Sequence, residues 1–155
     1  MKALTLWEPW ASFVAENLKR YETRSWGTSY RGLVLIHAAK RPPVEAEYMP
    51  CLQAIARAGK CAPYLGADRL GAIIAVAELV NCCEMSPTLH FPDEQGIAIE
   101  SRSALEIALG SWQIGRFAWE LENVRVLPEA IKCPGRQGLW NPPPEVIEQV
   151  MEVIA

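Results

Sequence analysis

Short runs of apolar residues, separated by polar or glycine- and proline-containing segments, dominate the hydrophobic pattern of this chain. Alternation of apolar and polar positions predicts strands over residues 2–6, 21–26 and 117–126. Residues 32–38 and 70–79 are almost continuously apolar, which is typical of central strands buried on both faces. The chain is therefore expected to contain several short strands that share one core.

Helical periodicity is weaker, and its clearest example lies near the N-terminus. Apolar residues follow Pro9 with the spacing i, i+3, i+4 and i+8 of one helix face: Trp10, Phe13, Val14 and Leu18. Proline is favoured in the first turn of a helix, where its missing N–H is not needed. Asn17 tolerates the left-handed conformation that ends many helices, so we expect the helix to end there.

Three further helices are expected along the chain. The first covers residues 44–58, where Pro50 predicts a kink or a division into two short pieces. The second covers residues 101–109, with Ser101 as its N-cap. The third covers residues 145–154 and has its valines on one stripe.

Two segments lack a clear period. Residues 81–99 are polar and contain Pro87 and Pro92, which indicates a long irregular connection that is a candidate lid or binding loop. Residues 133–140 are rich in glycine and predict a last strand with a bulge or tight turn.

The predicted strands outnumber the predicted helices and are short. This balance indicates an α+β fold in which a small, curved, mixed and mostly antiparallel sheet or β-barrel has helices packed outside it. No internal repeat or linker interrupts the pattern, so residues 1–155 are expected to form one domain.

Charge is unevenly distributed along the chain. The net charge of −3 argues against a protein that simply coats nucleic acid. However, residues 1–41 carry a balance of +4 and the remainder carries −7. A local basic patch on an acidic body is suited to a small anionic partner or a short piece of nucleic acid, although a solvated basic face gives the same pattern.

Cysteine usage and hydropathy limit the class of protein. Five cysteines, an odd number, and a start without a signal peptide favour reduced thiols in the cytoplasm. Cys82 and Cys83 are adjacent and have no evident activating neighbour, so we expect buried thiols there. We expect no structural zinc, no other cofactor and no membrane-spanning segment.

The densest group of chemically capable side chains lies in residues 17–26. On an extended strand Glu22, Arg24 and Trp26 share one face, while Thr23 lies on the other. Lys19, just before them, can supply a base, a nucleophile or an anion-binding charge in a partly desolvated cleft. An exposed ladder of ion pairs with little energetic value is the competing interpretation.

Six tryptophans are numerous for a chain of this length, and indoles stack well on nucleobases. Trp10 and Trp119 fall on apolar periodic faces and are expected in the core. Trp7 and Trp26 lie near turns or the basic segment and are better candidates for binding. Trp140 is compatible with either role.

Three other features are candidates for a site. Arg136 and Gln137 are flanked by glycines, which suits either close approach to a base edge or a bulged strand with solvated side chains. Glu78 is an acid in an apolar strand, so an Arg or Lys partner in the cleft is expected. His37 ends a buried strand and is expected to be a structural histidine.

These residues together resemble a known family. A helix followed by Asn17-Leu18-Lys19-Arg20-Tyr21-Glu22-Thr23-Arg24 is similar to the Gly-x-Lys-x-x-Glu-x-Arg signature of ASCH domains, with asparagine in place of glycine. Residues 31–37, 71–78, 115–119 and 135–140 also look like this family, so the resemblance spans nearly the whole chain.

The resemblance implies a PUA-like β-barrel with flanking helices and a cleft that the Lys-x-x-Glu-x-Arg segment lines. It implies RNA or nucleotide binding and, in some members, hydrolysis. One branch resembles N4-acetylcytidine amidohydrolases, which use a lysine, a threonine and a distant glutamate. Lys19 matches that lysine, whereas Glu22 stands where the threonine nucleophile is expected. Ribonuclease activity, with Lys19 and Glu22 as an acid/base pair, fits the sequence better.

We therefore expect a domain that binds RNA or a modified nucleoside or nucleotide in a basic, aromatic-edged cleft. A metal-independent hydrolase in the same cleft is the alternative, and a non-enzymatic protein-interaction module is a third. The catalytic candidates are Lys19 and Glu22. The candidates for ligand binding are Trp7, Arg24, Trp26, Glu78, Arg136 and Gln137.

Overall fold

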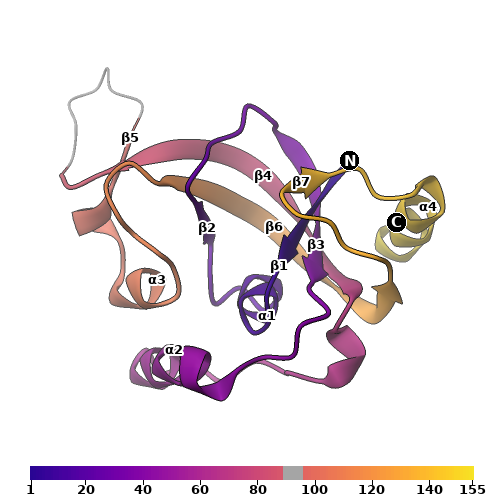
Figure 1. Ribbon diagram of the computed structural model, residues 1–155, viewed down its shortest axis with the longest axis horizontal. Coiled ribbons are helices and arrows are strands. Elements are labelled where there is room, and N and C mark those ends of the chain that lie inside the picture. The colour runs from indigo at the N-terminus through magenta and orange to yellow at the C-terminus, as the bar shows by residue number, and fades with distance from the viewer. Residues whose placement is uncertain (89–95) are drawn as a thin grey trace.

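A computed structural model describes residues 1–88 and 96–155 of the chain, and its centre is one curled sheet (Figure 1). The strands are β1 (Lys2–Leu6), β2 (Tyr21–Arg24), β3 (Gly32–Ala38), β4 (Ala72–Ser86), β5 (Gly96–Ala98), β6 (Phe117–Lys132) and β7 (Leu139–Trp140). In the described residues the order is β2-β6-β4-β3-β1-β7, and β5 pairs with β4.

The sheet is mixed and only partly closed. β1 pairs with β3 in parallel, β5 pairs with β4 in parallel, and the other ladders are antiparallel. The long strands β4 and β6 curve together across the molecule, with shifts of register along their ladder (Figure 1). Such irregularities increase local twist and bending. The expected α+β fold is confirmed, as a half-barrel whose edge strands are β2 and β7. β7 pairs only with Ala3 and Leu4 of β1, so Thr5 of β1 lies at the opening, where Arg24 of β2 reaches it.

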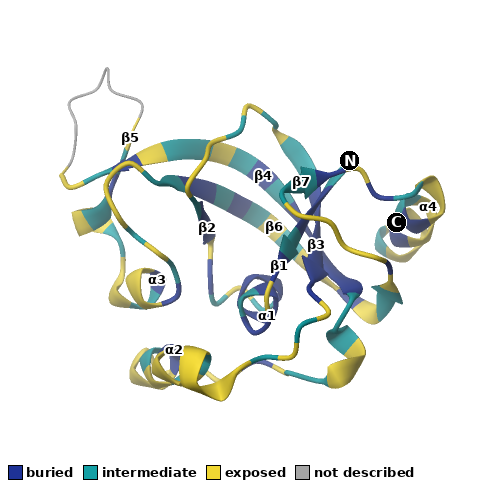
Figure 2. Ribbon diagram, viewed as in Figure 1, coloured by how far each residue is buried: buried dark blue, intermediate teal, exposed yellow. Residues whose placement is uncertain are grey.

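Four α-helices flank the sheet in the described part of the chain: α1 (Trp10–Ala15), α2 (Glu45–Arg57), α3 (Ala104–Ala108) and α4 (Pro144–Ile154). α1 lies inside the curl of the sheet, and almost all of it is buried (Figures 1 and 2). Its Ala11 and Val14 pack in one cluster with Trp119 of β6. Burial of apolar surface at about 25 cal/mol per Å² makes this contact a main attachment of the helix.

No helix among the described residues is long and apolar enough to cross a membrane.

β4 is longer than the sequence pattern predicts. The expectation of an irregular connection over 81–99 is wrong for residues 81–86, which continue the strand. Backbone pairing supports this extension, because Cys82 lies opposite Trp119 and Glu84 lies opposite Phe117. A polar stretch thus keeps its strand conformation through its partner strand. Of the proposed lid over 81–99, residues 89–95 lie outside the described residues, and residues 96–98 form β5 rather than irregular chain.

Other element ends also differ from the sequence expectation. α2 continues through Pro50 as one helix rather than two pieces. α3 begins after Ser103, whose hydroxyl accepts the Glu106 N–H at 3.1 Å, so Ser101 is not the N-cap. Only Leu139–Trp140 of the predicted last strand pairs with β1, and the glycine-rich residues before it form a loop.

The end of α1 follows the sequence prediction closely. Asn17 has φ of +57°, the left-handed conformation expected there. The Leu18 N–H donates to the Phe13 carbonyl at 2.8 Å, and the Asn17 N–H donates to the Val14 carbonyl at 3.1 Å. These two bonds form a Schellman motif. The turn also positions Lys19, two residues after Asn17, because the Lys19 N–H donates to the same Phe13 carbonyl at 3.0 Å.

Substitutions of Asn17 test this helix end. Asn17→Gly should leave the free energy of unfolding unchanged or raise it, since glycine adopts positive φ without strain. Asn17→Ala should lower it by about 1 kcal/mol, because a Cβ without a compensating polar group is disfavoured in this region. Urea denaturation of the three proteins measures the difference. Equal stabilities for the alanine and glycine variants would contradict this assignment.

Candidate functional site

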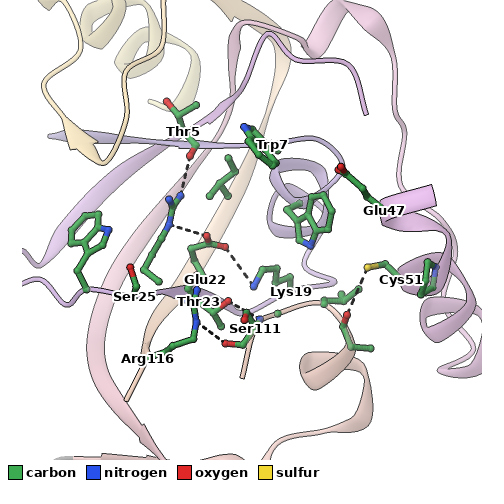
Figure 3. Close-up of a pocket in the computed structure, with 18 residues that line it drawn as sticks. Thr5, Trp7, Lys19, Glu22, Thr23, Ser25, Glu47, Cys51, Ser111 and Arg116 are labelled. Atoms are coloured by element: carbon green, nitrogen blue, oxygen red, sulfur yellow. Dashed lines mark hydrogen bonds and ion pairs between the residues drawn. The ribbon is translucent and has the colours of Figure 1, made fainter. Parts of the chain in front are cut away.

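A pocket of about 770 Å³ opens where the half-barrel is not closed, between β2 and β1 (Figure 3). Lys19 and Glu22 meet in its middle, with Trp7 on one side and Ser111 and Arg116 on the other (Figure 3). Its walls come from β1, the start of α1, β2, α2, and the end of α3 with the segment after it.

Lys19 is the deepest charged group of the pocket, with only 1% of the residue exposed. Its Nζ donates to the Tyr21 carbonyl oxygen and lies 3.5 Å from Glu22 Oε2. A buried ammonium requires such partners, because its desolvation is costly. The burial of both Lys19 and Glu22 argues against an exposed ladder of ion pairs.

Arg24 continues this ionic chain toward the opposite strand. Its Nε lies 3.0 Å from Glu22 Oε1, so the two residues share a face as the strand period predicts. Its Nη2 donates to the Thr5 carbonyl of β1 at 3.0 Å. Arg24 thereby spans the open side of the half-barrel. Two cations on either side of one carboxylate leave this triad with one net positive charge.

Thr23 faces the other wall, as the alternation predicts. Its Oγ1 accepts the Ser111 N–H at 2.9 Å, which ties β2 to the segment after α3. The Arg116 guanidinium donates to the Ser111 carbonyl at 3.1 Å and to the Thr23 carbonyl at 3.3 Å. These contacts use Thr23 to build the wall of the pocket.

Glu106 is a positioning residue that sequence reasoning missed. Its carboxylate accepts the Tyr21 N–H at 2.8 Å and the Arg20 N–H at 3.1 Å, so it holds the backbone directly after Lys19. The Ser-x-x-Glu spacing from Ser103 is that of a capping box, in which the glutamate would bond back to the cap. Here only the bond from the Glu106 N–H to the Ser103 hydroxyl forms, and the Glu106 carboxylate bonds to the backbone at the start of β2 instead.

The tryptophans divide largely as predicted. Trp7 and Trp26 are 56% and 38% exposed and line the pocket, whereas Trp119 is fully buried. Trp140 is buried and donates to Thr5 Oγ1 at 3.0 Å. Trp10 departs from the prediction, because it is only partly buried and also lines the pocket.

α2 is tied to Trp7 through one arginine. The Arg41 guanidinium lies over the Trp7 ring, 4.2 Å from its centroid, and makes two bonds of 2.8 and 3.0 Å to the Glu47 carboxylate. Cation–π and ionic contacts of this kind hold one face of the indole at the pocket edge.

A second pocket, of about 1030 Å³, adjoins the first. Four residues line both: Thr5, Trp7, Arg24 and Trp26. Arg136 and Gln137 line this second pocket, so the structure brings them close to Arg24 and Trp26 and separates them from Lys19.

Glu78 lies apart from both pockets. The expected Arg or Lys partner is wrong, because its Oε2 accepts from the Asn123 side-chain amide at 2.9 Å. Glu78 pairs in register with Glu122 of β6, and the next residue, Asn123, lies within the same strand with a positive φ of 51°. A residue on the sheet can satisfy a carboxylate locally without a cleft cation.

The thiols are not all buried. Cys82 and Cys83 are partly exposed rather than buried, and the Thr28 N–H donates to the Cys82 sulfur at 3.4 Å. Cys51 is buried and lines the first pocket. Burial raises the pKa of the Cys51 thiol, and the nearby Lys19 charge only partly opposes this, so Cys51 has no activated thiolate.

Among the described residues no group of His, Cys, Asp or Glu has the arrangement of metal ligands.

His37 forms part of the floor of the second pocket and is 1% exposed. Its Nε2 lies 2.8 Å from the Cys133 carbonyl, which can only accept, so Nε2 carries the proton and Nδ1 is left without a partner. Burial lowers the pKa of His37, and the bond to Cys133 only partly offsets this.

Stability should therefore depend on pH through His37. Because its pKa is lowered in the folded state, the neutral ring contributes fully above the unfolded value of about 6.5. This contribution is lost as pH falls from there toward the folded pKa. The free energy of unfolding, measured by urea denaturation, should fall less between pH 7.5 and pH 5.5 in His37→Gln than in the unmodified protein. Glutamine keeps a donor for the Cys133 carbonyl. An equal loss in both proteins would exclude His37 as the source.

The sequence matches known proteins over most of its length. Residues 4–129 match the model of the ASCH domain. Activating signal cointegrator 1 from Homo sapiens is 32% identical over 93 residues, and the same protein from Mus musculus is equally similar. The matched region covers 58% of this chain but only 16% of each relative. On the evidence of the family match and of the half-barrel with its Lys-x-x-Glu-x-Arg cleft, the chain belongs to the ASCH domain family of the PUA-like superfamily.

Proposed function

We propose that this chain binds single-stranded RNA, or a nucleotide of it, with one nucleoside held in the first pocket. The observation that carries the proposal is the buried Lys19–Glu22–Arg24 triad, which has one net positive charge at the centre of an open pocket. An anionic ligand offsets this charge, and the low local dielectric strengthens the attraction.

The aromatic edge of the pocket supports a nucleobase as the second half of the ligand. Trp7 and Trp26 are exposed at the rim, and base–indole stacking contributes about 1–3 kcal/mol per base. Trp26 is held in place because its ring meets Trp119 edge-on, with centroids 4.7 Å apart. A fixed indole loses little conformational freedom when a base stacks on it.

The family supports the same ligand class, since RNA or nucleotide binding is what ASCH domains are expected to do. An acidic chain with a basic pocket also favours a short, localised nucleic-acid contact over a coating mode. The proposed cleft consists of Lys19, Glu22, Arg24, Trp7 and Trp26. Glu78 is not part of it.

Lys19→Met tests the proposal, because methionine keeps the length of the side chain and removes its charge. Affinity for a labelled single-stranded RNA octamer should fall about tenfold or more, the effect of losing one charge-assisted contact. Fluorescence anisotropy measures the affinity at several salt concentrations. Lys60→Met is the matched control, since Lys60 is exposed and lines neither pocket.

Unchanged affinity in Lys19→Met, with folding verified by circular dichroism, would refute RNA binding in this pocket. Binding of a protein partner with no RNA binding at low salt would instead favour the interaction-module alternative.

A metal-independent ribonuclease in the same pocket is the second candidate. The observation that favours it is the buried contact between Lys19 and Glu22, 3.5 Å apart at the pocket centre. In this reaction Glu22 accepts the proton of a ribose 2′-OH, whose oxygen attacks the adjacent phosphorus. Lys19 gives a proton to the departing 5′-oxygen, and a 2′,3′-cyclic phosphate remains. Amidohydrolysis of N4-acetylcytidine fits less well, because Glu22 replaces the threonine nucleophile of that branch.

Glu22→Gln separates catalysis from binding. If the chain cleaves RNA, this variant should lose at least about a hundredfold in rate, the usual contribution of a general base. The assay incubates the protein with end-labelled RNA, and in parallel with N4-acetylcytidine, and analyses the products by chromatography. A product that forms equally fast with the variant comes from a contaminant, and the absence of product from the unmodified protein would rule out the hydrolase.

A further inference from the structure

We propose that the second pocket is a phosphate-binding subsite for the nucleic acid whose nucleoside occupies the first pocket, with Lys40 and Arg136 as its phosphate contacts. This inference rests on the proposed function and deepens it, because it defines the ligand as a phosphorylated nucleotide or strand rather than a free nucleoside.

The two pockets form one continuous surface. Thr5, Trp7, Arg24 and Trp26 line both of them. A base that stacks on the Trp26 or Trp7 indole therefore has the second pocket directly beside it. A nucleotide is itself bipartite, with an apolar base and an anionic phosphate, and it matches this division of the surface.

The charge of the second pocket is unbalanced. Its lining includes Arg24, Lys40, Lys132 and Arg136 but neither Asp nor Glu. In the first pocket, by contrast, Glu22 and Glu47 accompany the cations. A concave surface with only basic side chains, on a chain whose net charge is −3, concentrates positive potential and attracts phosphate.

Two of these four cations are not occupied by other groups. Arg24 is paired with Glu22, and Lys132 Nζ donates to the Asp68 and Leu70 carbonyls at 2.7 and 2.8 Å. Lys40 and Arg136 are exposed, and neither forms an ion pair within residues 1–88 and 96–155. They are thus the side chains available to bind phosphate oxygens.

The backbone on both sides positions these two cations. A Cβ at Gly135 would lie 2.3 Å from His37 Cε1, so the Arg136 loop rests directly on the imidazole and only glycine fits there. A Cβ at Gly71 would lie 3.6 Å from Lys40 Cγ, so the stem of Lys40 lies close to that glycine, whose carbonyl accepts the Cys133 N–H at 3.2 Å. His37, with its unpartnered Nδ1, lines the same pocket.

The test uses the double variant Lys40→Gln/Arg136→Gln, which changes only exposed side chains. Its affinity for the single-stranded RNA octamer should fall about tenfold or more, and the salt dependence should weaken by about 1.4 in log–log slope for two lost phosphate contacts. Arg57→Gln/Lys60→Gln is the matched control. It removes the same charge from exposed positions that line neither pocket, and it should bind as the unmodified protein does.

Smaller probes locate the phosphate. Cytidine, cytidine 5′-monophosphate and the dinucleotide CpC are compared by isothermal titration calorimetry with both variants. If the test variant loses affinity for the monophosphate but not for cytidine, the subsite binds a terminal phosphate. If it loses affinity only for CpC, the subsite binds the phosphate of the strand backbone. Both results support the subsite, whereas an equal loss of affinity for cytidine, which has no phosphate, would contradict it.

The failures of the two proposals are distinguishable. If Lys19→Met weakens octamer binding and Lys40→Gln/Arg136→Gln does not, the phosphate subsite is refuted and RNA binding stands. If the control double variant loses as much affinity as the test variant, the effect is one of total charge and the subsite is also refuted. If Lys19→Met and the test variant both bind like the unmodified protein, the proposed function itself fails.

Discussion

The buried ammonium of Lys19 is the constraint on which the rest of the site depends. A charge with almost no access to water needs an acceptor and a counter-charge, and the Tyr21 carbonyl and the Glu22 carboxylate supply them. The backbone that carries these acceptors must therefore be held, and Glu106 does this by accepting two consecutive backbone N–H groups. The helix end at Asn17 sets the direction from which Lys19 arrives.

The open half-barrel explains why this ionic chain is accessible to a ligand. A closed barrel would join its two edge strands by a backbone ladder, whereas here the Arg24 guanidinium of β2 reaches across to the Thr5 carbonyl of β1. A side chain replaces the backbone ladder at this point and leaves room for two adjoining pockets. The incomplete closure of the sheet is thus what creates a site at this position.

Long-range contacts explain the residue roles and element boundaries that the sequence pattern did not predict. Glu106 follows a capping spacing that predicts a local bond, yet its carboxylate bonds to β2, which lies far away in the sequence. β4 extends through a polar stretch because β6 lies beside it. Glu78 is an acid in an apolar run, which suggested a cation in the cleft, but the side-chain amide of Asn123 in β6 satisfies it. In each case a partner distant in sequence overrides a local rule.

Local rules were sufficient wherever one residue or one period determines the outcome. The sequence by itself determined the helix end at Asn17, the shared face of Glu22 and Arg24, and the α+β balance, since left-handed φ, strand alternation and apolar periodicity act over a few residues. Only the tertiary structure decided that Lys19 is buried and that Arg136 lines the same pocket as Arg24. The curl of the sheet brings these groups together, and neither spacing nor composition encodes a distance between strands that are far apart in the chain.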